Sequence, residues 1–242
     1  MWQDLRNELQ AKGLEVVTVG IDTAGAEACR PFIEAARPEH PSLIDVGHIV
    51  AERFGVINIP NGVWIDESGT IVRPAEPAFP GRPSPRAAAD MGEIPDHMQA
   101  IFSEAVKIEV DPEAYAAAIR DWAEKGAAST HVLSPQEVVA RSGRRGVDES
   151  MAAAHFALAQ HLWRAGDHRR AETHFAAAHR LHPTNFSYKR QAWSLATPEM
   201  GAFERYWQGP VPGREDEWPY EGDWLSEVKA MGAANYYPRV DL

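Results

Sequence analysis

The chain has 242 residues, of which 44% are hydrophobic, so it can form one large domain or two small ones with an apolar core. Its formal net charge of -11 at pH 7 argues against a surface that binds nucleic acid or anionic membranes. The sequence shows neither an apolar run of the roughly 20 residues that a membrane-spanning helix needs nor the pattern of a signal peptide. Its single cysteine, Cys29, excludes an intramolecular disulfide and a cysteine-based zinc site and fits a reducing, cytoplasmic compartment.

Residues 1–73 alternate between helical and strand patterns. Apolar residues at helical spacing predict an N-terminal helix that ends near Gly13, and a β-branched run over 14–22 predicts a buried parallel strand. The next predicted elements are a helix over 27–37, a strand over 42–46, a short helix over 48–55 and a hairpin over 62–73. This order favours parallel strands joined by helices, with a final antiparallel pair.

A proline-rich loop over 74–94 leads to two predicted helices, of which the second begins at Asp111 as its N-cap and is followed by proline. We expect this second helix to pack on the sheet. Residues 127–149 are polar and contain glycine, which is typical of a linker between domains, and one short helix is predicted over 135–140.

Residues 150–196 are predicted to be helical and contain one repeat-like pattern. Small and apolar residues occupy fixed positions on two helices joined by a turn, and a proline closes the unit. These positions are Leu158, Ala159, Leu162, Gly166, Asp167, Ala171, Phe175, Ala178 and Pro183. The pattern resembles a tetratricopeptide repeat, in which small residues let two antiparallel helices approach closely.

One such repeat cannot bury its own apolar faces. We expect residues 186–195 to form a third, capping helix. Leu158, Leu162, Phe175 and Ala178 are predicted to fill one interface, and Phe156, Trp163 and Trp193 to need a second. The tail over 197–242 carries many tryptophans and tyrosines among prolines and glycines and is expected to wrap over the domains.

The first part of the chain resembles thioredoxin-like proteins of the TlpA and ResA type. The resemblance rests on a strand that ends in Asp22, the strand segment Leu43-Ile44-Asp45, the helix end Phe54-Gly55-Val56, the Ile59-Pro60 turn and the segment from Ile65 to Gly69. It covers about residues 1–73. It implies a thioredoxin-like α/β domain and the activity of a thiol-disulfide oxidoreductase.

The resemblance implies a substrate-binding turn at Ile59, Pro60 and Asn61. In this family the proline follows a cis peptide bond, and the backbone of the residue before it pairs with the peptide of a disulfide substrate. We therefore predict a cis bond between Ile59 and Pro60. The family usually has threonine after the proline, where this chain has Asn61, and this departure weakens the expectation of substrate contact.

The family's redox motif, Trp-Cys-x-x-Cys, is absent, so no catalytic residue is expected in residues 1–242. The segment from Met1 to Gly13 matches the later part of the helix that carries this motif. The first strand, which is central in the family's sheet, and the motif itself would precede Met1. Some ResA-like proteins carry selenocysteine, encoded by UGA, as the first motif residue. Because UGA is also read as a stop codon, we expect that the reading frame begins upstream of Met1. The alternative is a natural degenerate paralogue.

Cys29 and the histidines of residues 155–182 are the other candidate site residues. Cys29 shares a predicted helix face with Phe32 and Ile33, which favours a small buried residue over a redox cysteine. Six histidines fall between His155 and His182, without partners at metal-ligand spacing, which favours a solvated helical face. No metal site and no cofactor motif is expected.

The predicted organisation is an α/β thioredoxin-like domain that lacks its first strand, followed by an all-α segment. The ranges are 1–126 for the thioredoxin-like domain, 127–149 for the linker, 150–196 for the tetratricopeptide-like helices and 197–242 for the tail. The leading hypothesis is a thiol-disulfide or selenol-dependent oxidoreductase, inactive without its upstream motif, that acts on a disulfide-bearing protein or a small thiol substrate. The alternatives are a redox-dead interaction module, with a protein partner or dimer contact at the helices, and a peroxiredoxin-like peroxidase, whose Thr-x-x-Cys site is also absent.

Overall fold

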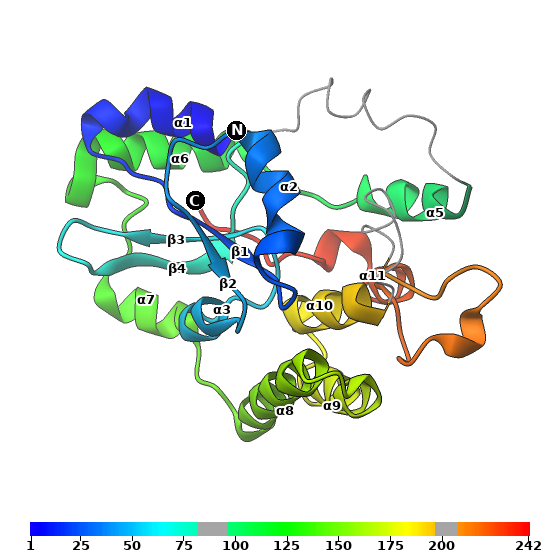
Figure 1. Ribbon diagram of the computed structural model, residues 1–242. Coiled ribbons are helices and arrows are strands. Elements are labelled where there is room, and N and C mark those ends of the chain that lie inside the picture. The colour runs from blue at the N-terminus through cyan, green and yellow to red at the C-terminus, as the bar shows by residue number, and fades with distance from the viewer. Residues whose placement is uncertain (82–95, 197–207) are drawn as a thin grey trace. The chain divides into compact units, whose positions relative to one another are not determined.

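A computed structural model describes residues 1–81, 96–196 and 208–242 (Figure 1). The structure is mixed α/β and divides into two compact units. We call them the α/β unit, which comprises Met1–Pro83, Asp111–Arg144 and Arg239–Leu242, and the helical unit, which comprises Ser84–Val110 and Arg145–Pro238. Most of the predicted proline-rich loop and the first part of the predicted tail lie outside the described residues.

The α/β unit begins with the alternation of helices and strands that the sequence predicts. Its elements are α1 (Trp2–Leu9), β1 (Thr18–Ile21), α2 (Ala26–Ala36), β2 (Ser42–Asp45), α3 (Ile49–Phe54), β3 (Asn61–Ile65), β4 (Ile71–Pro77), α6 (Pro112–Lys125) and α7 (Pro135–Ser142). Short 3-10 turns follow α1 and α6.

The strands of this unit form two separate two-stranded sheets (Figure 1). β1 and β2 are parallel, with Thr18 opposite Ser42 and Ile21 opposite Asp45. β3 and β4 are antiparallel, with Asn61 opposite Pro77, and Asp66 accepts hydrogen bonds from the backbone of Ser68 and Thr70 in the turn between them. Among the described residues, no pairing joins β1 to β3.

The core of the α/β unit forms where α1 and α6 meet β3 and β4. Leu5 and Leu9 of α1 are buried with Trp64 of β3 and with Tyr115 and Ile119 of α6. The sequence dictates this helix locally: the side chain of Asp111 accepts the N–H of Ala114 at 2.9 Å, and Pro112 occupies the first turn. The prediction that this helix packs on the sheet is confirmed.

Residues 127–144 belong to the α/β unit and do not form an unattached linker. α7 begins with a capping box, in which Glu137 N–H donates to Ser134 Oγ and the Ser134 N–H donates to the Glu137 carboxylate. The segment before α7 attaches to the sheet edge, because the N–H of Leu133 donates to the carbonyl of Val72 on β4 at 3.1 Å. The division between the units therefore falls at 144–145.

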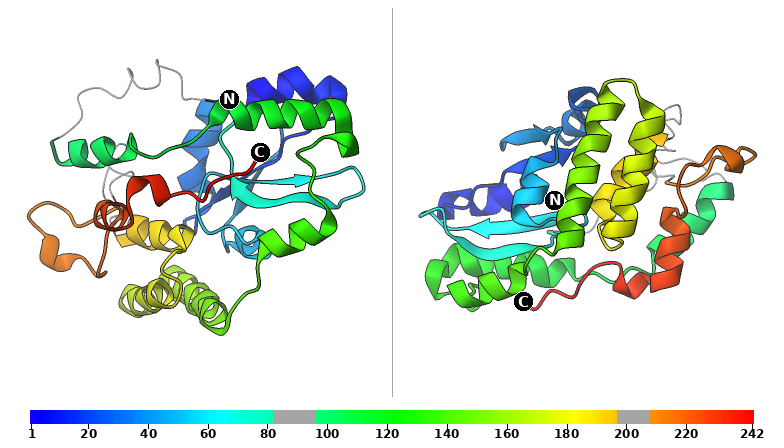
Figure 2. Two further views of the ribbon diagram at one scale, coloured as in Figure 1. Left: turned by 180° about the vertical axis from the view of Figure 1, so that it is seen from behind. Right: turned by 90° about the horizontal axis from the view of Figure 1, so that it is seen from below.

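Within its described residues, the helical unit contains four helices that follow α7 and one that precedes α6 (Figure 2). They are α5 (Asp96–Ala105), α8 (Val147–Arg164), α9 (His168–Leu181), α10 (Phe186–Ala196) and α11 (Trp224–Met231). The three predicted helices over 150–195 are confirmed as α8, α9 and α10. α5, which the expected range of 1–126 places with the sheet, belongs to this unit instead, because Met98 and Ile101 are buried in its core.

Phe156 and Trp193 lie in the core of the helical unit, which the described part of the tail helps to form. Phe156 stacks on Tyr188 with ring centres 4.1 Å apart, and Trp193 is fully buried. Trp224 and Tyr236 of the tail are buried in the same cluster. The prediction that Leu158 fills a helix interface is wrong, because its side chain is 42% exposed. α8 turns Ala152, Phe156 and Ala159 inward at spacings of four and three, so Leu158 falls on the outer face.

Candidate functional site

The predicted substrate-binding turn lies at the start of β3, and the bond between Ile59 and Pro60 is cis, as predicted. Asn58 shapes the approach to this turn, since its side-chain oxygen accepts the N–H of Ile59 at 2.9 Å. Pro60 is exposed, and its carbonyl accepts the N–H of Ala78 at 3.4 Å. The turn therefore joins the start of β3 to the end of β4.

The side chain of Asn61 has a buried hydrogen-bond acceptor that no donor contacts among the described residues. Its Oδ1 atom makes no hydrogen bond to any described residue. An unpaired buried acceptor of this kind costs about 1–3 kcal/mol unless a ligand or a water molecule supplies a donor. Asn61 thus offers an acceptor beside the exposed Pro60.

Aromatic side chains of β3 and α6 pack together next to the turn. Trp64 Nε1 donates to the hydroxyl of Tyr115 at 3.0 Å, and the Trp64 ring stacks on Trp122 at 5.0 Å. Burial raises the pKa of Tyr115, so this hydroxyl remains neutral. Gly62 is required here, because a Cβ atom on it would lie 2.7 Å from the Tyr115 oxygen. These contacts fix the position of the strand that follows Pro60.

Each of the four strands described in the α/β unit has a strand partner on one side only, so β1 and β3 each have one edge without a strand partner. β1 pairs only with β2, and β3 pairs only with β4. Parallel strands are normally covered on both faces, yet Val17, Leu43 and Ile44 in and beside the β1–β2 pair are exposed. The β1–β2 pair therefore presents open backbone groups and uncovered apolar side chains together.

Cys29 lies in the first turns of α2 and is buried against β1. Its Sγ is 3.0 Å from the place that a Cβ atom on Gly20 would occupy. Burial, and next the negative charge of Asp22, raise the pKa of the Cys29 thiol. A raised pKa disfavours the thiolate that attacks disulfides. These contacts match those of a packed core residue.

Arg73 on β4 is a buried charge whose role the sequence did not reveal. The guanidinium is 1% exposed and binds the Glu76 carboxylate through two hydrogen bonds of 2.7 and 2.9 Å. It also donates to the backbone carbonyls of His131 and Asp241, each at 2.9 Å, and lies over the Trp64 ring. Glu76 is only three residues away on β4, but His131 and Asp241 are distant in sequence, so no local pattern predicts the whole cluster. Arg73 anchors the C-terminal residues to the α/β unit.

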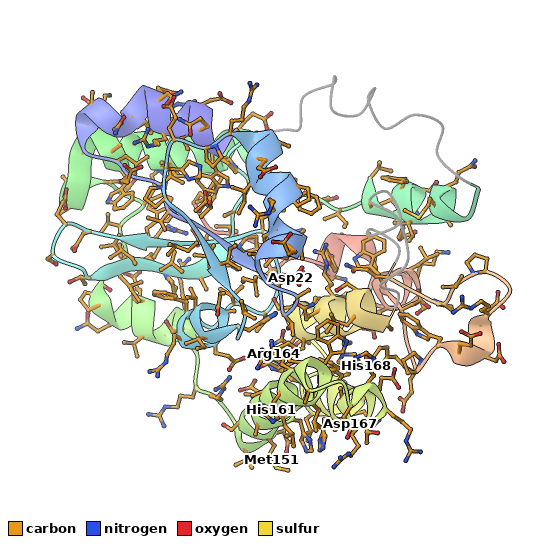
Figure 3. The ribbon with its side chains drawn as sticks, viewed as in Figure 1. Asp22, Met151, His161, Arg164, Asp167 and His168 are labelled. Carbon is orange, nitrogen blue, oxygen red and sulfur yellow. The ribbon has the colours of Figure 1, made fainter. Side chains whose placement is uncertain are left out.

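The histidines of the helical unit do not all lie on a solvated face. His155 and His174 contact each other between α8 and α9, with Nδ1 atoms 2.8 Å apart, which corrects the expectation that these histidines lack a histidine partner. His179 is half-buried beside Trp193 and Tyr220, and the loss of solvent around its ring lowers its pKa to about 3. His161 and His168 are exposed near the α8–α9 turn, where Figure 3 labels them together with Arg164 and Asp167.

No helix within the described ranges is long and apolar enough to cross a membrane. The same ranges contain no group of three or more histidine, cysteine, aspartate or glutamate side chains that could hold a metal ion. Comparisons of the chain with protein-family models, with curated proteins and with solved structures give no match.

Proposed function

We propose that this chain is part of a thiol-disulfide oxidoreductase of the TlpA and ResA type, whose redox motif lies on a strand that precedes Met1. The observation that carries the proposal is the pair of open strand edges on β1 and β3. The family's central first strand pairs with the two strands that correspond to β1 and β3. A strand inserted between these edges would convert the two sheets into one with the order β2-β1-inserted strand-β3-β4.

Four further features support this assignment. The helices and strands of residues 1–77 follow the order that the family shows after its motif, and the predicted cis bond precedes β3. The helix α1 would be the later part of the helix that carries the motif. The exposed Val17, Leu43 and Ile44 fit a sheet that another segment covers in the complete protein.

The reaction of the complete protein would be thiol-disulfide exchange. The first motif residue, a cysteine thiolate or a selenolate, attacks one sulfur of the substrate disulfide and displaces the other as a thiolate. The second motif cysteine then attacks the mixed bond, which releases the reduced substrate and leaves the enzyme oxidised. A dithiol reductant returns the two electrons. Within residues 1–242, Ile59, Pro60 and Asn61 would position the substrate, which must replace the bond between Ile59 N–H and Asn58.

Assays of two proteins test this proposal. The first is residues 1–242, and the second is the same chain extended by the codons that precede Met1 in its reading frame. We expect an in-frame motif of Trp, Cys or selenocysteine, two residues and Cys, and insulin-disulfide reduction by the extended chain alone. Serine in place of the first motif residue is the matched control and should abolish turnover. An upstream sequence without such a motif, or an inactive extended chain that folds, would contradict the proposal.

The second candidate function is a redox-dead module that associates through the helical unit. It is favoured by apolar residues on the outer face of α8, where Val147, Met151 and Leu158 are exposed at spacings of four and seven. Such spacing forms one stripe along a helix. A second copy of α8 is the occupant we test. Leu158→Lys should abolish any dimer that sedimentation detects for the wild-type chain, whereas a monomeric wild type would exclude self-association through α8.

A further inference from the structure

The imidazole rings of His155 on α8 and His174 on α9 contact each other through their Nδ1 atoms within the helical unit. Their Nδ1 atoms are 2.8 Å apart, and their ring centres are 5.1 Å apart. The centre-to-centre distance is close to the nitrogen separation plus one ring radius at each end. The two nitrogens therefore lie nearly on the line between the ring centres, and each points at the other.

Such a pair of nitrogens can hold one electrophile between them. In the hydrogen-bonded form one Nδ1 carries a proton and the other accepts it. A linear, two-coordinate metal ion requires the same opposed arrangement of two neutral imidazoles. With metal–nitrogen bonds of about 2 Å, the two nitrogens would have to move apart by roughly 1 Å. Both side chains are only half-buried, so rotation can supply this movement.

The arrangement is unsuited to ions that need more ligands. Tetrahedral zinc requires four ligands at bent angles, and the described residues offer no cluster of three or more histidine, cysteine or acidic side chains. A soft third ligand is nevertheless close by in sequence. Met151 precedes His155 by four residues on α8, a spacing that places two side chains on one helix face, and it is exposed. Thioethers favour Cu(I).

We propose that His155 and His174, with Met151 as a weaker third ligand, bind a monovalent d10 cation, Cu(I) or its analogue Ag(I). Each histidine binds through Nδ1. The proton shared between the two Nδ1 atoms moves to the Nε2 atom of its own ring, so both imidazoles remain neutral and no proton is released. The site lies entirely in the helical unit and is independent of the redox function proposed for the α/β unit.

The test uses Ag(I) nitrate in chloride-free buffer, because Ag(I) is stable in air. Cys29 must be replaced first, since a thiol binds these ions in preference to imidazole. Titration calorimetry of the full chain carrying Cys29→Ala should give one ion per chain. Nitrogen–proton NMR spectra should show shifts of the Nδ1 atoms of His155 and His174 at one equivalent.

Single substitutions test the contribution of each of the three proposed ligands to Ag(I) binding. His155→Gln and His174→Gln should each weaken binding by about tenfold or more, and Met151→Leu by a smaller factor with the stoichiometry kept. His161→Gln is the control, because His161 is an exposed histidine on the same helix, and it should bind Ag(I) like its parent. Undiminished binding by both glutamine variants of the pair would overturn the proposal.

Two further outcomes would also overturn it. The first is shifts confined to other histidines, and the second is no binding at all, which would show that the pair only shares a proton. If Cys29→Ala does not fold, the unsubstituted chain still decides the matter. Cys29 should take up the first equivalent of Ag(I), and the His155 and His174 signals should shift with the second.

Discussion

The indole nitrogen of Trp64 donates a 3.0 Å hydrogen bond to the hydroxyl of Tyr115 and thereby joins β3 to α6 across 51 residues of sequence. Both side chains are buried, and the Tyr115 hydroxyl lies close to Gly62, two residues after Pro60. It links the core of the α/β unit to the backbone that would position a substrate.

Tyr115→Phe should destabilise the α/β unit. The substitution leaves the Trp64 N–H without its partner in a buried place, which costs about 1–3 kcal/mol. Urea unfolding followed by tryptophan fluorescence measures the change. Trp64→Phe and the double variant complete a cycle, and the second substitution should cost less in the presence of the first. Equal costs in both backgrounds would show that the bond contributes nothing.

Gly62→Ala should destabilise the chain by about 1–3 kcal/mol, because the new methyl group overpacks the core. Its Cβ would lie 2.7 Å from the Tyr115 oxygen and 3.0 Å from Ala78 Cβ. Removing the oxygen with Tyr115→Phe should recover part of this loss, which the unfolding midpoint of the double variant measures. If the two losses simply add, the contact with Tyr115 is not the cause.

Arg73→Met should be among the most destabilising substitutions in the chain. It leaves the Glu76 carboxylate buried without its cation, which typically costs 3–5 kcal/mol. The double variant Arg73→Met with Glu76→Gln should be more stable than Arg73→Met alone. The two carbonyls that Arg73 binds also lose a donor, so residues 239–242 should become accessible to carboxypeptidase. A tail that resists the enzyme as in the wild type would contradict the anchoring role.

His179 should make the stability of the helical unit depend on pH. Burial lowers the pKa of His179 to about 3 in the folded chain, whereas an ordinary histidine titrates near 6.5. The unfolded chain therefore binds the extra proton between these values, so stability should fall as pH drops from about 6.5 towards 3, by up to roughly 1.4 kcal/mol per unit. His179→Gln should flatten this slope, and His161→Gln should not. An unchanged slope in His179→Gln would contradict the assignment.

Elements with strong local signals were predictable from sequence. The Asp111 cap and Pro112 define the start of α6, and the small residues of the repeat locate α8 and α9. The cis bond before β3 was predictable only from the resemblance to a family.

Features that depend on distant contacts were missed. α5 belongs to the helical unit because it packs with α11, more than a hundred residues later. The Arg73 cluster and the His155–His174 pair join residues from separate elements, so no spacing pattern reveals them. The repeat-like pattern wrongly predicts that Leu158 fills an interface, because the pattern fixes which positions are apolar, whereas the rotation of α8 decides which of them face inward.

Within the described residues, the β1 edge that faces away from β2 is open to another strand. The N–H of Thr18 donates to the carbonyl of Pro41 on the β2 side. The backbone N–H groups of Thr18 and Gly20 therefore face β2, and those of Val19 and Ile21 face away from it. Amide hydrogen exchange on residues 1–242 tests the claim most directly. We predict fast exchange at Val19 and Ile21, slow exchange at Thr18 and Gly20, and protection of all four in the extended chain. Val19 and Ile21 amides that already exchange as slowly as their neighbours in residues 1–242 would contradict it.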